Sequence, residues 1–77
     1  MLTEQDKARE RATLEAASEQ ELFEYCEQYI WLSAYAANNP YSDYHWKCDA
    51  GYAECARRGR VDLYKQAHAR ARRSAGC

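Results

Sequence analysis

Residues 18–40, SEQELFEYCEQYIWLSAYAANNP, determine most of the expected fold. Ser18 followed by Glu21 is a capping-box pattern, in which the hydroxyl accepts from the third amide and the carboxylate reaches back to the cap. An apolar run follows this pattern. Two asparagines and a proline at 38–40 then end the helix, because asparagine tolerates left-handed geometry and proline pushes the preceding residue out of the α region. The stretch therefore predicts a helix over residues 19–37.

The same kinds of signal predict helices on both sides of this stretch. Thr3 with Asp6 offers a cap for the first helix, Ser42 or Asp43 can cap the third, and Gly59 is the usual left-handed terminator before the last. These signals give three further helices, over residues 3–16, 42–58 and 61–73. We therefore expect an all-α fold, a compact three- to four-helix bundle that forms a single helical domain over all 77 residues.

The composition limits what the interior can contain. The chain has fourteen alanines and seven tyrosines, but Leu, Ile, Val and Phe together number only eight. A core must therefore use Ala, Tyr, Cys and Trp, while the small net charge of −1 and the many aromatics argue against disorder. No stretch approaches the roughly 20 apolar residues of a membrane helix, and the first eighteen residues are too charged for a signal peptide. We expect a cytoplasmic protein that does not enter membranes, with reduced cysteines that are buried except for Cys77.

The predicted second helix has two contrasting faces. At about 100° per residue its opposite face collects Glu24 and Glu27, but also Trp31 and Tyr35, where a solvated helix should be polar. Either another helix of this chain covers these two aromatics, or they form an intermolecular surface. In the second case an acidic surround selects a basic partner. The apolar face of the helix consists of Leu22, Tyr25, Cys26, Tyr29, Ile30, Leu32, Ser33 and Ala36.

The predicted third helix is apolar on two sides, which places it centrally. Tyr44, Cys48, Gly51 and Cys55 share one side, and Trp46 lies nearly opposite. A glycine within a helix costs roughly 1 kcal/mol relative to alanine, so Gly51 is best explained as a point where a neighbouring helix approaches closely. The last helix turns toward the bundle with Val61, Leu63, Tyr64, Ala67 and Ala71.

Charge is distributed unevenly along the chain. Residues 1–45 carry a net charge of −6, and residues 46–77 carry +5. The basic half suggests nucleic-acid binding as an alternative function, since phosphate neutralisation supplies most non-specific affinity. Cations at helix C-termini, a basic last helix beside the acidic second one, or a homodimer that joins unlike halves would also account for the pattern. The candidate nucleic-acid contacts are Lys65, Arg70, Arg72 and Arg73.

Metal and catalytic sites receive little support from the sequence. Cys48 and Cys55 share a helix face but lie about 10.5 Å apart at ~1.5 Å per residue, whereas zinc ligands lie within ~2.3 Å of the ion. His45 with Cys48 would serve only if Cys26 and a further ligand came from neighbouring helices, and the same pair is the one local candidate for a thiol with a base. We predict no metal, no cofactor and no enzymatic activity.

What remains is a binding protein. Rigid aromatics alternate with polar residues from Tyr35 to Trp46, a composition typical of recognition surfaces, although the same tyrosines would also close the open end of a bundle short of Leu and Ile. We expect a small module that binds another protein or a ribonucleoprotein complex stoichiometrically. One concrete version is an inhibitor or adaptor from a mobile element, for example a phage anti-defence or anti-CRISPR-type protein that blocks a nucleic-acid-handling complex. The predicted contacts are Glu24, Glu27, Trp31, Tyr35, Tyr41 and Tyr44.

Overall fold

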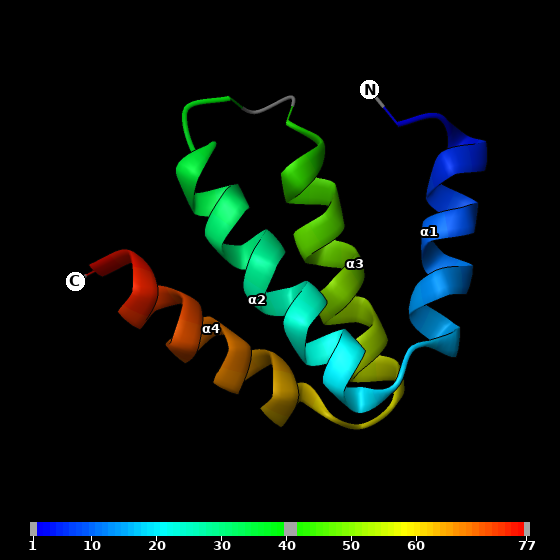
Figure 1. Ribbon diagram of the computed structural model, residues 1–77. Coiled ribbons are helices and arrows are strands. Elements are labelled where there is room, and N and C mark those ends of the chain that lie inside the picture. Colours follow the sequence, from blue (N-terminus) through cyan, green and yellow to red (C-terminus); the bar gives the residue numbers. More distant parts are fainter. Residues whose placement is uncertain (1, 40–41, 77) are drawn as a thin grey trace.

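The computed structural model describes residues 2–39 and 42–76, and the side chains up to residue 73. These residues form four helices: α1 (Glu4–Ala16), α2 (Glu19–Tyr35), α3 (Asp43–Arg57) and α4 (Val61–Gly76). α2 and α3 lie side by side in the middle, with α4 along α2 and α1 beside α3 (Figure 1). The Cα atoms extend over 36 × 28 × 15 Å, so the bundle is flattened. The predicted all-α bundle is confirmed.

The predicted caps begin three of the helices. Ser18 Oγ accepts from the Glu21 amide at 3.1 Å, and Glu21 Oε1 accepts from the Ser18 amide at 2.9 Å. Thr3 and Asp6 form the same reciprocal pair, with both bonds at 3.1 Å. Ser42 Oγ accepts from the amide of residue 44 at 3.2 Å and caps α3. The sequence signals for these helix starts were therefore correct.

Two helix ends differ from the prediction by more than one residue. α2 ends at Tyr35, two residues early, because Ala36 leaves helical geometry at φ −94° and ψ 24° and the chain turns there. The turn is held from α3, since His45 Nε2 donates to the Asn39 carbonyl at 3.0 Å. α4 continues to Gly76 rather than ending at residue 73. Gly59 has φ +70°, as expected of a left-handed terminator, whereas Pro40 lies outside the described residues.

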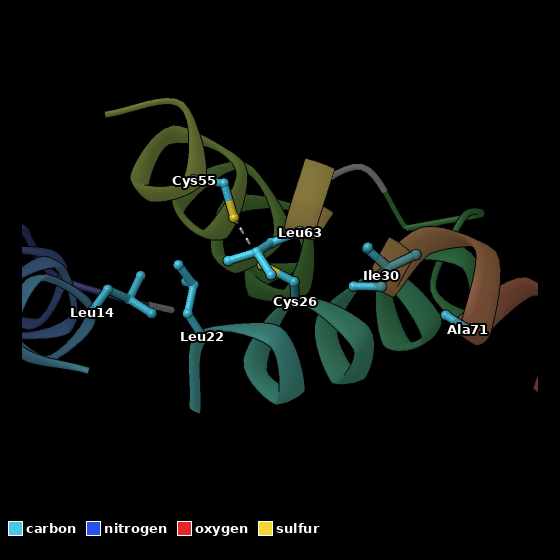
Figure 2. Close-up of a cluster of buried hydrophobic side chains, with 8 residues drawn as sticks. Leu14, Leu22, Cys26, Ile30, Cys55, Leu63 and Ala71 are labelled. Atoms are coloured by element: carbon cyan, nitrogen blue, oxygen red, sulfur yellow. Dashed lines mark hydrogen bonds between the residues drawn. The ribbon is translucent and has the colours of Figure 1, made fainter. Parts of the chain in front are cut away.

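The core lies along α2. Figure 2 shows its side chains in a row, from Leu14 of α1 at one end to Ile30 and Ala71 at the other. A Cβ atom at Gly51 would lie 2.9 Å from Cys26 Sγ, which confirms the predicted close approach of two helices at this glycine. Among the described residues the buried apolar side chains are Leu14, Leu22, Cys26, Ile30, Cys55, Leu63, Ala67 and Ala71.

A charged cluster joins the end of α3 to the end of α1. Glu54 is buried and accepts hydrogen bonds from Arg57 at 2.6 and 2.9 Å and from Arg58 at 2.6 Å. Arg58 Nη2 also donates to the carbonyls of Leu14 and Ala17, both at 2.8 Å. Arg58 therefore satisfies carbonyls at the end of α1, in addition to the general effect of a cation at the C-terminus of its own helix.

Within residues 2–39 and 42–76, no helix combines the length and the apolar character that a membrane crossing requires.

Candidate partner-binding surface

The outer face of α2 exposes two large aromatic side chains. Trp31 is 40% exposed and Tyr35 is 80% exposed. The two rings are nearly parallel, with their centroids 5.7 Å apart and their planes at 9°. This stacking follows from their spacing of four residues, which brings side chains together on one helix face. We call this pair the aromatic ridge. The explanation that another helix of the described chain covers it is wrong.

A groove between α2 and α4 borders the ridge. Its volume is about 480 Å³, within the range of sites that hold small ligands. Trp31 and Leu32 contribute aromatic and aliphatic surface from α2, and Ala71 contributes a small side chain from α4. Glu27 and Gln28 add polar atoms. The lining of the groove therefore combines apolar side chains with one carboxylate.

The acidic residues of the surface have different surroundings. Glu27 forms a salt bridge with Arg70 of α4, with Nε 3.0 Å from Oε2. Glu24 lies one turn earlier on the same stripe, is exposed, and accepts from Gln20 Nε2 at 2.9 Å. The ion pair supports the interpretation that the basic last helix packs beside the acidic second one. Arg60 and Glu19 form another ion pair between the two halves of the chain.

Tyr44 does not join the aromatic ridge. It is exposed at the start of α3, and its ring centroid lies 6.2 Å from that of Tyr29. Residues 29 and 31 are about 200° apart around a helix, so Tyr29 and Trp31 face different sides of α2. The structure thus brings together Glu24, Glu27, Trp31 and Tyr35 of the predicted contacts but separates Tyr44 from them. Tyr41 lies outside the described residues.

The candidate nucleic-acid contacts lie on the outer side of α4. Lys65, Arg72 and Arg73 are exposed. Arg70 is also exposed, but its guanidinium lies 5.8 Å from the Phe23 ring centroid in addition to pairing with Glu27. Part of the positive charge of α4 is therefore used within the molecule, against α2.

The thiols and histidine near α3 have partners in the interior. Burial raises the pKa of the Cys26 and Cys48 thiols, which disfavours the thiolate that a nucleophile or metal ligand requires. Cys48 Sγ lies 3.2 Å from the Tyr64 hydroxyl, and His45 Nδ1 lies 2.6 Å from Ser33 Oγ. In the part of the chain that the structure describes, no cluster of three His, Cys, Asp or Glu residues is arranged to hold a metal ion.

The sequence missed three residues of the groove. Leu32 was placed on the apolar face, Ala71 was correctly assigned to the core, where it is 2% exposed, and Gln28 was placed on the outer face but not among the predicted contacts. Their role depends on how α4 lies against α2, and the periodicity of one helix contains no information on that placement. A small residue such as Ala71 opposite a large aromatic is the one signal available, and it also fits simple close packing.

Comparison with known proteins gives no match, whether with family models, curated proteins or solved structures. The function is therefore argued from the geometry of this surface.

Proposed function

We propose that the protein is a small non-enzymatic binding module that attaches stoichiometrically to a basic protein surface through the aromatic ridge and the adjoining groove. The exposed, stacked pair of Trp31 and Tyr35 carries this proposal. Trp and Tyr are the residues most enriched among interface anchors, because they bury a large area with few rotatable bonds. Folding alone does not explain why a chain with few apolar residues leaves both of these side chains exposed to water.

The charge around the ridge supports a basic partner. Glu24 and Glu27 lie on the same stripe of α2 as Trp31, and Glu19 and Glu21 continue the acidic character toward the start of the helix. Carboxylates at the rim of an interface steer a positively charged surface and disfavour an acidic one. Surfaces that bind nucleic acids are basic, so one version of this function is an inhibitor that occupies such a surface on its partner.

Capture from an extract of the native host tests the proposal. The wild-type protein should retain a basic protein that a Trp31→Ala/Tyr35→Ala variant loses by at least tenfold. Tyr52→Ala is the matched control, because Tyr52 is an exposed tyrosine of α3 whose ring contacts Tyr64. The purified partner should then form a complex of fixed stoichiometry with the wild type in native mass spectrometry. A partner set that is the same for all three proteins would refute the proposal.

Nucleic-acid binding through α4 is the second candidate function, and the exposure of Lys65, Arg72 and Arg73 favours it. Fluorescence anisotropy with a labelled 20-base-pair duplex tests it. If it is correct, affinity falls steeply between 50 and 200 mM salt and is lost when all three residues become alanine. Equal affinity of this variant and the wild type removes the candidate.

A further inference from the structure

The chain already binds cations on its own aromatic rings. Arg11 and Lys7 lie 5.3 and 5.7 Å from the Trp46 ring, and Lys47 lies 4.9 Å from the Tyr29 ring. On α2, Arg70 lies over Phe23 and pairs with Glu27. These rings and carboxylates show how this molecule accommodates positive groups: the cation contacts an aromatic face, and a nearby carboxylate balances its charge.

The groove shares the Glu27 carboxylate with the Phe23 site and has an aromatic ring of its own, Trp31. Phe23 and Trp31 are eight residues apart on α2, and Glu27 lies midway, about 6 Å along the axis from each at ~1.5 Å per residue. Arg70 forms its salt bridge with the Oε2 atom of Glu27 and also lies over the Phe23 ring. On the other side Glu27 lines the groove together with Trp31. One carboxylate is thus flanked by two aromatic rings, and Arg70 of the chain itself contacts the first.

Part of the Trp31 side chain is open to a ligand, because the residue is 40% exposed and lines the groove. Tyr35 stacks on the ring in a nearly parallel orientation, so it covers one face. Tyr35 is not among the residues that line the groove, which Trp31 borders together with Leu32 and Ala71. Trp gives the strongest cation–π attraction of the aromatic residues. Among the described residues no cation lies over the Trp31 ring, whereas Arg70 lies over Phe23.

We propose that this groove binds an arginine side chain from a basic segment of the partner. The guanidinium stacks on Trp31 and donates to the Glu27 carboxylate beside Arg70, while the methylene stem lies over Leu32. Arginine fits better than lysine because a planar guanidinium stacks on an aromatic face, donates to a carboxylate in a fixed geometry and is less strongly hydrated than an ammonium. This inference rests on the proposed function and specifies which side chain anchors the partner.

The other ligand chemistries fit the groove less well. A phosphate or an acidic side chain would meet Glu27 and, one turn away, Glu24. A purely apolar side chain would cover part of Glu27 without adding a hydrogen bond to its carboxylate, and removing a charged group from water without a compensating bond costs free energy. A guanidinium with an aliphatic stem matches both the carboxylate and the apolar side chains of the lining.

A peptide titration of the full chain tests the inference. The probe is a nine-residue peptide of alternating glycine and arginine, compared with matched peptides in which lysine or neutral citrulline replaces arginine. Binding is followed by NMR through the two tryptophan indole N–H signals, which a Trp31→Phe variant assigns. The arginine peptide should shift the Trp31 signal and leave that of Trp46 in place. It should bind at least tenfold more tightly than the lysine peptide, and the citrulline peptide should not bind.

Two charge variants locate the site. Glu27→Gln should weaken binding of the arginine peptide at least tenfold. Glu4→Gln removes the same charge from a carboxylate whose side chain is 90% exposed on α1, and it should leave binding unchanged within twofold. An equal loss in both variants would show that the peptide responds only to net charge and would overturn the site.

The results separate the inference from the proposed function. Equal binding of the arginine and lysine peptides, with the Trp31 shift retained, overturns the arginine assignment and leaves the basic-partner surface intact. If the arginine peptide does not shift Trp31 while the host partner is still captured through the ridge, the groove is not the anchor site. If both the peptide shift and the ridge-dependent capture are missing, both proposals fail.

Discussion

Trp46 and Trp31 lie on opposite sides of the central α2–α3 pair, and they differ in their burial and in their ring contacts. Trp46 is half-buried and has Lys7 and Arg11 of α1 over its ring. Trp31 is 40% exposed, and its ring partner, Tyr35, comes from its own helix. The first tryptophan receives its cations from within the chain, whereas the second presents its surface outward. The two tryptophans therefore differ in where their ring contacts come from: those of Trp46 come from another helix, and that of Trp31 comes from its own.

The attachment of α1 to the rest of the bundle depends mainly on polar contacts. Of the described residues 4–16, only Leu14 is buried. Further contacts come from the Tyr25 hydroxyl, which donates to Glu10 at 3.0 Å, from Lys47 3.6 Å from the same carboxylate, and from Arg58 at the C-terminus of the helix. With so little apolar burial, α1 is expected to open at a lower free energy than the rest of the bundle. The following changes test this difference between the two sides.

Replacing Trp46 should have the largest effect. Trp46→Ala removes the aromatic surface under Lys7 and Arg11, and we expect a loss of about 3 kcal/mol, at the low end for a tryptophan because the side chain is only half-buried. Amide protons of α1 should exchange much faster while those of α2 keep most of their protection. Urea unfolding and hydrogen-exchange NMR measure the two effects. Unchanged protection of α1 would contradict its dependence on Trp46.

Glu54→Gln should have the next largest effect, a loss of about 2 kcal/mol in the free energy of unfolding near neutral pH. The substitution weakens charged hydrogen bonds to a buried group. Hydrogen bonds from Arg57 and then Arg58 lower the pKa of Glu54 from 4.5 to about 2, against the opposing effect of burial. A lowered folded-state pKa stabilises above the unfolded value, so this contribution is complete above pH 4.5 and is lost as the pH falls toward 2.

Urea titrations at several pH values measure this effect. The difference in stability between wild type and Glu54→Gln should shrink as the pH falls from 4.5 to 2. Glu4→Gln, in an exposed carboxylate, is the control and should show little difference at any pH. A constant difference across the range would show that the Glu54 charge is not the source of the stability.

Gly51→Ala tests the close contact between α2 and α3, the central pair of helices that lies between the two tryptophans. Alanine improves helix propensity by roughly 1 kcal/mol, but its Cβ would lie 2.9 Å from Cys26 Sγ, and overpacking costs typically 1–3 kcal/mol. We expect a net loss of about 1 kcal/mol in urea unfolding. In a Cys26→Ala background the sulfur is gone, so Gly51→Ala should become neutral or stabilising. The same loss in both backgrounds would contradict the close approach.

Trp31→Ala should have the smallest effect on stability, a loss below about 1 kcal/mol, because the side chain is partly exposed and its ring contact lies on the same helix. Thermal and urea unfolding check this expectation, in direct contrast to Trp46→Ala. A loss comparable to that of Trp46→Ala would mean that Trp31 is structural, and the contrast between the two sides would disappear.

The sequence predictions were accurate where the interactions are between residues close together in the chain, and less accurate where they join distant residues. The caps at Thr3, Ser18 and Ser42 and the terminator at Gly59 were predicted correctly, because each is decided within a few residues of backbone. The end of α2 was placed two residues late. Its position depends on a turn that His45 of the next helix holds by its ring, and no local signal reports that contact.

The charged cluster at the end of α3 was not predicted for a similar reason. A glutamate followed by two arginines at three and four residues normally indicates an exposed helix turn. Glu54 is instead buried, because α1 ends beside it and Arg58 spans from its carboxylate to the carbonyls of Leu14 and Ala17. The burial of this carboxylate depends on residues about forty positions earlier in the chain.

The sequence by itself determined the helices, their apolar faces and the close approach at Gly51, since these depend on backbone geometry and on periodicity within one segment. It also showed that Trp31 and Tyr35 lie away from the apolar face of their helix. Only the tertiary structure decided that no helix of the described chain covers them. The groove at Ala71 likewise exists because α4 packs beside α2 through small side chains and stops short of covering the ridge. Such placement is set by long-range packing, which no single helix encodes.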